Sequence, residues 1–214
     1  RSISNDPQLQ AEMLTEEIKG FQENGVLTTG KHFPGDGCDA RNQHIVGSVN
    51  NLSREEWLES YGKVYRSAFN AGMMAVMVGH ISVPAFQNDA VDGVYPPASL
   101  SADAMRLLKE ELGFKGVAIT DAMDMGGFVR WKFDRRKAEV EAFKAGLDMM
   151  LWPREETAEL IEKAVENGEI PMSRLDDAVG RIQALKETIP DFEAKPEQYE
   201  SSLEFAKATQ SKVA

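Results

Sequence analysis

The sequence predicts an α/β protein built around a parallel sheet. Four times, a helical stretch that ends near a glycine is followed by a short apolar run. Glycine just past a helix accepts the left-handed conformation that closes the helix. The apolar runs do not alternate with polar residues, which is typical of strands that are buried on both faces, as in a parallel sheet. Helices that alternate with such strands indicate the α/β class.

The apolar runs are the expected strands. They are VLTT at 26–29, MMAVMV at 73–78, VAIT at 117–120 and LDMML at 147–151. Four β/α units with long loops after the strands make half of a (β/α)8 barrel, which typically needs roughly 250 residues. An open, flavodoxin-like sheet is the competing architecture.

Start signals precede the helices that connect these strands. Asp6 before Pro7 reads as an N-cap followed by proline at the first helical position. Ser53 and Glu56 fit a capping box. Ser101 opens a third helix and Ser173 a fourth. In the helices that follow Asp6, Ser53 and Ser173, apolar residues recur close to the 3.6-residue period.

Composition narrows the function classes. Apolar residues make up 42% and charged residues 28% of the chain, which is ordinary for a globular protein. The net charge of -11 argues against nucleic acid or an anionic membrane as the main partner. No run of about 18 apolar residues predicts a membrane span, and one cysteine, Cys38, allows no disulfide within the chain. No signal peptide is visible, but the chain begins at Arg1 without a methionine, so the sequence does not assign a cellular compartment.

Ionisable side chains gather where the expected strands end. The first strand leads into Lys31 and His32, the second into His80 and the third into Asp121. Functional groups in parallel α/β folds lie at the carboxyl ends of strands. The loop after the first strand adds His44, so all three histidines are expected at one edge of the sheet.

Two chemistries fit this placement. One is a carboxylate enzyme that uses Asp121 as nucleophile together with a separate proton donor. The other is a metal site built from His32, His44, His80 and Asp121, because imidazole and carboxylate can hold zinc. The chain lacks a close ligand pair such as H-x-H or H-E-x-x-H, which ranks the metal site second. Four of the residues at this edge also have a structural interpretation. Asp121 fits a turn cap, His32 and His80 fit packed histidines that are satisfied by the backbone, and Lys31 fits a solvated loop lysine.

Specific motifs then point to a family. KHFPGDG at 31–37 and AITDAMDMGG at 118–127 resemble the two signature stretches of glycoside hydrolase family 3. RSISNDP at 1–7 is similar to the RSF-x-x-DP element of that family, and MVGHISVPAF at 77–86 to a further stretch between the signatures. The order and approximate spacing agree, and the resemblance covers essentially the whole chain.

The resemblance implies a retaining glycosidase of the β-N-acetylglucosaminidase or β-glucosidase type, with a barrel as its N-terminal domain and no cofactor or metal. Asp121 matches the catalytic nucleophile. Lys31, His32 and Arg1 match the residues that bind sugar hydroxyls. His44 matches the acid/base histidine of the β-N-acetylglucosaminidase branch, whereas the β-glucosidase branch takes its acid/base from elsewhere, often from a second domain.

The chain departs from the family pattern in two ways. Asn42 stands where the family has the aspartate that pairs with the acid/base histidine, so the partner of His44 brings no charge. Asp39 is close by and is a candidate replacement, and His80 is a further candidate for support. The family barrel also has several β/α units before the RSF element, at which this chain starts. We therefore expect residues 1–190 to be a partial catalytic domain, the C-terminal half of a (β/α)8 barrel, and residues 191–214 a helical tail or linker toward a missing second domain.

The expected function is hydrolysis of terminal β-linked sugars, β-N-acetylhexosaminidase-like, through a glycosyl-enzyme intermediate. A β-glucosidase or β-xylosidase of the same family, with its acid/base from another domain, is the first alternative. An inactive fragment or a carbohydrate-binding half-barrel is the alternative from another class. The expected partner is a carbohydrate, together with the missing barrel half or second domain.

Overall fold

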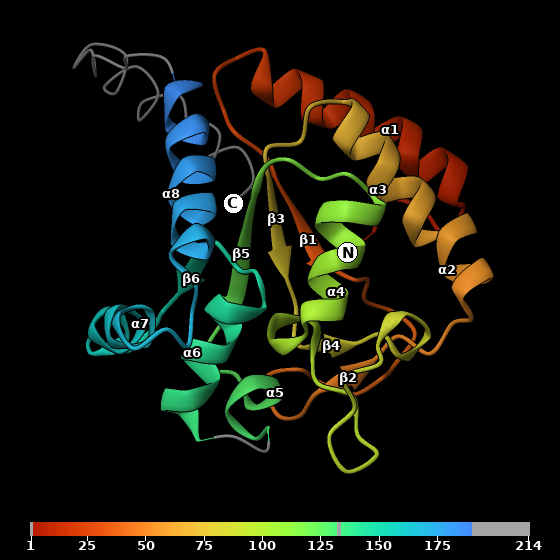
Figure 1. Ribbon diagram of the computed structural model, residues 1–214. Coiled ribbons are helices and arrows are strands. Elements are labelled where there is room, and N and C mark those ends of the chain that lie inside the picture. Colours follow the sequence, from red (N-terminus) through yellow and green to blue (C-terminus); the bar gives the residue numbers. More distant parts are fainter. Residues whose placement is uncertain (1, 132–133, 190–214) are drawn as a thin grey trace, which may run out of the picture.

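A four-stranded parallel sheet organises residues 2–131 and 134–189, the part of the chain that the computed structural model describes (Figure 1). The strands are β1 (Thr29–Phe33), β3 (Ala75–Val78), β5 (Val117–Ala122) and β6 (Met149–Leu151), in that order across the sheet. Each strand pairs in parallel with the next, which confirms the predicted α/β class. A flavodoxin-like sheet reverses its order at a switch point, whereas this order follows the chain.

The first strand begins later than expected. Of the VLTT run only Thr29 belongs to β1, and the strand continues through Lys31 and His32. Pairing decides this start, because Thr29 is the first residue aligned with Ala75 of β3. Val26 precedes the aligned region and is exposed.

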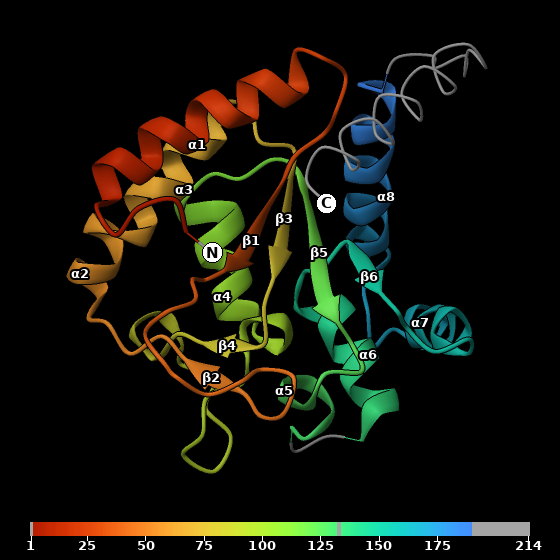
Figure 2. The same cartoon turned by 180° about the vertical axis from the view of Figure 1, so that it is seen from behind.

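The structure also contains a small second sheet that the sequence did not predict. Its parallel strands are β2 (Ser48–Val49) and β4 (Ile81–Ser82). They lie beyond the carboxyl ends of β1 and β3, on the side to which the arrowheads of the large sheet point (Figure 2). Strands of two residues are too short to show a period of two in the sequence.

Most of the helices lie between successive strands. They are α1 (Pro7–Gln22), α2 (Arg54–Glu59), α3 (Tyr61–Asn70), α4 (Ala102–Arg106), α5 (Gly126–Val129), α6 (Arg135–Ala145), α7 (Thr157–Glu166) and α8 (Met172–Glu187). A π-helical turn, η3 (Leu107–Glu111), continues α4, and two short 3-10 turns, η1 (Pro84–Phe86) and η2 (Ala98–Leu100), precede it.

The helix starts predicted at Asp6, Ser53 and Ser101 are confirmed, whereas α8 begins at Met172 after Pro171, before the Ser173 that was expected to open it. Asp6 accepts hydrogen bonds from the backbone N–H groups that open α1, and Ser53 forms a complete capping box with Glu56 at the start of α2. Ser101 accepts a hydrogen bond from the N–H of Ala104 at 3.1 Å and opens α4. These caps satisfy N–H groups that have no partner within the helix.

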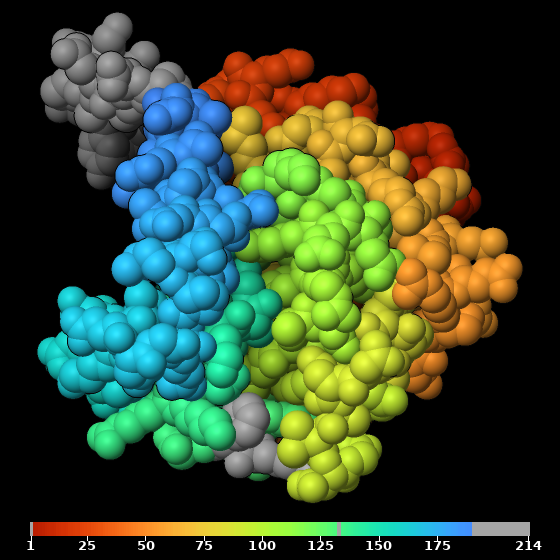
Figure 3. Space-filling view, viewed as in Figure 1, coloured from red at the N-terminus to blue at the C-terminus, as the bar shows by residue number. Residues whose placement is uncertain are grey.

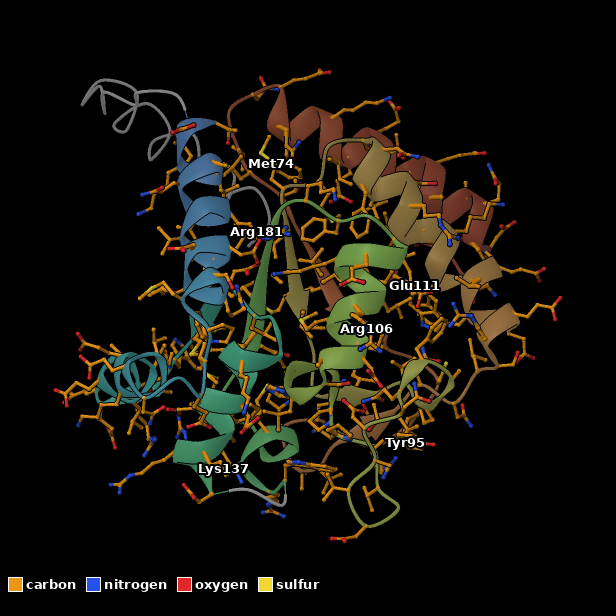
Figure 4. All side chains as sticks on the ribbon, viewed as in Figure 1. Met74, Tyr95, Arg106, Glu111, Lys137 and Arg181 are labelled. Atoms are coloured by element: carbon orange, nitrogen blue, oxygen red, sulfur yellow. The ribbon has the colours of Figure 1, made fainter. Side chains whose placement is uncertain are left out.

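The helices pack on one face of the sheet. In the space-filling view onto this side, α4 lies between α3 and α8 (Figure 3). Beneath them, Phe33 makes an edge-to-face contact with Trp57, at a ring separation of 6.2 Å, and both side chains are fully buried. Arg181 of α8 reaches across to the start of β5, where it donates to the carbonyl of Gly116 at 3.0 Å (Figure 4).

The opposite face of the sheet is not covered by any described element (Figure 2). Lys31, Met77, Ile119 and Met149 form one row across the four strands on this face. All four are partly or fully exposed. The residues that alternate with them on β3 and β5 are buried under the helices: Val76, Val78, Ala118 and Thr120. The expectation that the strands are buried on both faces is therefore wrong within the described residues, because burial here comes from one side only.

Within the described residues, no helix is long and apolar enough to cross a membrane. The predicted tail or linker at 191–214 lies outside the described residues.

Candidate active site

The carboxyl edge of the large sheet brings two of the predicted residues together. Nε2 of His32, on β1, lies 3.5 Å from Oδ2 of Asp121, on β5. β3 lies between these strands, and Gly79 follows it. A Cβ at Gly79 would lie only 3.0 Å from the Cβ of His32. The absence of a side chain at this glycine therefore leaves the space through which the imidazole reaches Asp121.

His32 lies between two carboxylates. The pairing of β1 with β3 shifts between Lys31 and Phe33, so His32 is the extra residue of an irregularity in β1. Its Nδ1 lies 2.7 Å from Oδ2 of Asp36. Only 12% of the His32 side chain is exposed, so the ring is confined between Asp36 and Asp121.

Asp36 contacts His32 in the candidate site, and the sequence did not reveal this contact. Its second carboxylate oxygen, Oδ1, accepts a hydrogen bond from Nε2 of Gln43 at 2.5 Å. Gln43 comes from the same long loop, seven positions further along the chain. The two contacts fix the carboxylate that orients His32. In the sequence, Asp36 is marked only by its place between two glycines in KHFPGDG, and this pattern does not indicate that its carboxylate contacts His32.

The carboxylate of Asp121 is fixed at one oxygen. Oδ1 accepts a hydrogen bond from the backbone N–H of Ala122 at 2.8 Å, and Oδ2 faces His32. The side chain is 14% exposed. The pairing of β5 with β6 is irregular between Ile119 and Ala122, where Asp121 lies. The arrangement holds the carboxylate in place and leaves part of it accessible from the edge of the sheet.

Lys31 lies within strand β1 and not in a loop. It pairs with Met77 of β3 and belongs to the row on the uncovered face of the sheet. Its side chain is exposed. The ammonium group is thus available to a ligand that approaches this face.

His44 and Asn42 form a local pair in the loop after β1. Oδ1 of Asn42 accepts a hydrogen bond from the backbone N–H of His44 at 3.0 Å and lies 2.9 Å from Nδ1 of its ring. The N–H groups of Ile45 and Val46 bond to the carbonyl of Asn42 and close a single helical turn. In this orientation the N–H at Nδ1 donates a hydrogen bond to Oδ1 of Asn42, and Nε2 of the exposed ring remains available for other contacts.

Asp39 does not take the place of the missing dyad aspartate. Its carboxylate accepts hydrogen bonds from Nε of Arg41 at 2.7 Å and from the N–H of Val49 at 2.9 Å. The hydrogen bonds from Arg41 hold the pKa of the Asp39 carboxyl well below its usual range. The partner of the His44 ring in this structure is Asn42.

His80 is a packed histidine that supports the end of β5. Its Nδ1 lies 2.8 Å from Oγ of Ser99, and its Nε2 lies 2.9 Å from the carbonyl oxygen of Ala122. The ring is fully buried, and burial lowers its pKa. Both nitrogens are engaged, so His80 is not available for the four-residue metal site considered from the sequence. Within residues 2–131 and 134–189, no three His, Cys, Asp or Glu side chains are placed to hold a metal ion.

The loop with His44 is docked on the segment that follows Asp121. The N–H of Gly126 donates to the carbonyl of His44 at 2.8 Å, and that of Gly127 donates to the carbonyl of Gln43 at 2.9 Å. The sequence placed both segments at one edge of the sheet, but it did not predict this contact. Arg1, the remaining predicted sugar-binding residue, lies outside the described residues.

Comparison with known proteins identifies relatives over most of the chain. The model of the glycosyl hydrolase family 3 N terminal domain matches residues 1–185. The chain is 37% identical over 196 residues to the β-N-acetylglucosaminidase/β-glucosidase of Cellulomonas fimi, an alignment that covers 88% of this chain and 35% of that protein.

Solved structures share the fold. The β-glucoside phosphorylase BglX bound to 2FGlc superposes with a TM-score of 0.81 at 33% identity, over 89% of this chain and 36% of that one. A family 3 β-N-acetylglucosaminidase from Paenibacillus gives a TM-score of 0.80 at 33% identity, over 88% and 36%. The parallel α/β fold therefore matches part of family 3 N-terminal domain structures, and the chain spans about a third of the length of these relatives.

Proposed function

The chain belongs to the glycoside hydrolase family 3 N-terminal domain family, and we propose on this premise that it carries the nucleophile and sugar-binding residues of a retaining β-glycosidase. The proposed substrate is a terminal β-linked sugar, β-N-acetylhexosaminide-like. The observation that carries the proposal is the approach of His32 to Asp121 at the carboxyl edge of the sheet, 3.5 Å apart.

Asp121 is the proposed nucleophile. Its Oδ2 attacks the anomeric carbon, the glycosidic bond breaks, and a glycosyl ester of Asp121 forms. Water then cleaves the ester and restores the carboxylate. The hydrogen bond from the N–H of Ala122 to Oδ1 supports this role, because it holds the carboxylate in one orientation before attack.

Lys31 and His32 are the proposed ligands of the sugar hydroxyls, and Arg1 is a third by its match to the family motif. Lys31 lies on the uncovered face and directly precedes His32, which lies between Asp36 and Asp121. Hydroxyl contacts in such a position strengthen as the ring distorts toward the transition state.

His44 is the proposed acid/base. In this role its Nε2 donates a proton to the leaving oxygen and then takes one from the attacking water. The support is the pairing of Nδ1 with Asn42, which orients the ring as a second group orients a catalytic histidine in other hydrolases.

We also propose that the domain is the later half of a (β/α)8 barrel. The support is the sequential strand order and the sheet face with the row Lys31, Met77, Ile119 and Met149, which no described helix or strand covers. In a closed barrel this face is the interior, filled by side chains from all the strands. A further barrel half is the proposed partner of this surface.

Phosphorolysis is a second candidate, favoured by one observation. The His44–Asn42 pair holds no carboxylate, and the nearby Asp39 is neutralised by Arg41. An anionic nucleophile therefore meets less repulsion here than beside a carboxylate base. A phosphate oxygen would attack the anomeric carbon of the glycosyl ester, Asp121 would leave as carboxylate, and the product would be a glycosyl phosphate.

A trapping experiment tests the nucleophile. The intact, active enzyme is incubated with a 2-deoxy-2-fluoro-β-glucoside that has a dinitrophenyl leaving group, digested and analysed by mass spectrometry. We expect the fluorosugar mass on the peptide that contains Asp121, and no label in Asp121→Asn. A label on another carboxylate would overturn the assignment.

A second measurement separates hydrolysis from phosphorolysis. Turnover is followed with and without inorganic phosphate, and the products are examined by phosphorus NMR. A glycosyl phosphate and faster turnover in phosphate support phosphorolysis. Free sugar with unchanged rate supports hydrolysis, and no turnover with either acceptor supports the inactive or carbohydrate-binding alternative.

A further inference from the structure

We propose that Gly126 and Gly127 are positioning residues that fix the His44 loop, residues 36–46, against the end of the strand that carries Asp121. The inference rests on the proposed function for the role of His44 as proton donor. The docking itself rests on the contacts between the two segments alone.

The hydrogen bonds between the segments cap a helix. Gly126 and Gly127 are the first residues of α5, and the N–H groups of a first helical turn have no partner within the helix. Met125 at the N-cap supplies no side-chain acceptor. The carbonyls of His44 and Gln43 supply the two acceptors instead, at 2.8 and 2.9 Å. Since both glycines are buried, these N–H groups would lose their hydrogen bonds if the loop moved away.

Close approach of backbone to backbone explains why these residues are glycines. A Cβ at Gly126 would lie 2.1 Å from the carbonyl oxygen of Ile45 and 2.8 Å from that of His44. A Cβ at Gly127 would lie 2.9 Å from the Cβ of His80 and 3.0 Å from the carbonyl oxygen of Gln43. Backbone atoms cannot rotate away as a flexible side chain can. Neither glycine has a positive φ, so the contact and not the backbone conformation requires glycine.

The two contacts set where His44 lies. Its carbonyl is held by Gly126, and its ring is held by Asn42. Gly126 follows Asp121 by only five positions, in a segment that His80 also holds through the carbonyl of Ala122. Proposed proton donor and proposed nucleophile are thereby fixed to one short segment of backbone. A shift of about 1 Å in such a pair can cost about a hundredfold in rate.

Hydrogen exchange tests the docking without any activity. In the parent chain, the amides of Gly126 and Gly127 should exchange at least about tenfold more slowly than their intrinsic rates, because both are bonded and buried. In Gly127→Ala, exchange at these positions should accelerate and the NMR signals of His44 should shift. Gly47→Ala is the matched control, since a Cβ there would find its nearest neighbours at 3.8 Å. Unprotected glycine amides in the parent would overturn the docking.

Kinetics of the intact enzyme test the positioning role. Gly126→Ala should lower kcat for a substrate with a poor leaving group about a hundredfold, and much less for a dinitrophenyl glycoside, which needs no proton. Gly127→Ala, whose clash is milder, replaces it if Gly126→Ala does not fold, and Gly47→Ala should match the parent.

The outcomes distinguish the inference from the proposed function. If the loss of activity in His44→Ala depends on the leaving group but the loss in the folded glycine variant does not, the positioning role is wrong and the assignment of His44 as proton donor is retained. If the glycine variant loses activity equally on every substrate, a general structural role replaces the one proposed. If His44→Ala is silent on all substrates, the proposed donor is wrong, and the exchange experiment decides the docking on its own.

Discussion

His32 reaches Asp121 across an intervening strand: Nε2 of one lies 3.5 Å from Oδ2 of the other, although β1 and β5 are not neighbours. The irregularity at His32 and the glycine after β3 make this approach possible.

Asp121→Ala should lower kcat of the intact enzyme by about 10³-fold or more, because covalent catalysis depends on its attacking group. Steady-state kinetics with an aryl β-N-acetylglucosaminide and an aryl β-glucoside measure the loss. Asp124→Ala, an exposed carboxylate three positions further along, is the matched control. Activity of Asp121→Ala within tenfold of the parent would remove the assignment.

Asp36→Asn should weaken transition-state binding about ten- to hundredfold, because it removes the carboxylate that holds Nδ1 of His32 at 2.7 Å. The double variant with His32→Ala should lose no more than His32→Ala alone, since both changes act on one ring. kcat/KM of the four proteins in this cycle is the measurement. Asp176→Asn, an exposed aspartate on α8, is the control. Additive losses would show that Asp36 does not act through His32.

Lys31→Ala should weaken the binding of a monosaccharide inhibitor about ten- to hundredfold, the usual range for a hydrogen bond from a charged group. Calorimetric titration gives the dissociation constant directly. Lys115→Ala removes an exposed lysine from the opposite end of the sheet, just before β5, and should bind like the parent. Equal affinities in Lys31→Ala and the parent would contradict the sugar-binding role.

Local signals in the sequence predicted much of this fold. The caps at Asp6, Ser53 and Ser101 depend on residues within a few positions of one another, so they could be predicted and are confirmed. The placement of His32 and Asp121 at one edge followed from the rule for parallel strands, and their contact is consistent with it.

Features that depend on distant segments were not predictable in the same way. The irregularity at His32 is set by the register with β3, and the contact of Gly126 with the His44 loop joins segments about 80 positions apart. Asp39 was a reasonable candidate by proximity to His44 in the sequence, yet the turn between them directs its carboxylate to Arg41 and Val49. Sequence spacing does not determine side-chain direction in a loop.

His80 should make the free energy of unfolding fall as the pH drops below about 6.5. Burial lowers its pKa in the folded protein, so the unfolded chain binds the proton more tightly. The stabilisation is present above the unfolded pKa and is lost as the pH falls from there toward the lower folded pKa. Urea unfolding of the parent and of His80→Gln at pH 7.5 and pH 5 measures this effect, because all other titrating groups are shared. An identical pH dependence in both proteins would contradict it.

His44→Ala should act according to the leaving group. A poor leaving group needs a proton in the transition state, and general acid catalysis is worth about 10²–10⁴-fold, whereas a dinitrophenolate departs without help. Asn42 holds the ring at 2.9 Å but brings no charge, so it stabilises imidazolium less than a carboxylate would. Asn42→Asp should therefore raise kcat/KM on poor leaving groups and leave dinitrophenyl substrates nearly unchanged. It should also slow any phosphorolysis, since the new charge repels phosphate.

The measurement for His44→Ala and Asn42→Asp is a plot of log kcat/KM against leaving-group pKa for the parent and the two variants. The slope should be steepest for His44→Ala and shallowest for Asn42→Asp. Three parallel lines would assign the proton donor to a group outside this chain, and the β-glucosidase-type arrangement with a donor from another domain would then replace the His44 proposal.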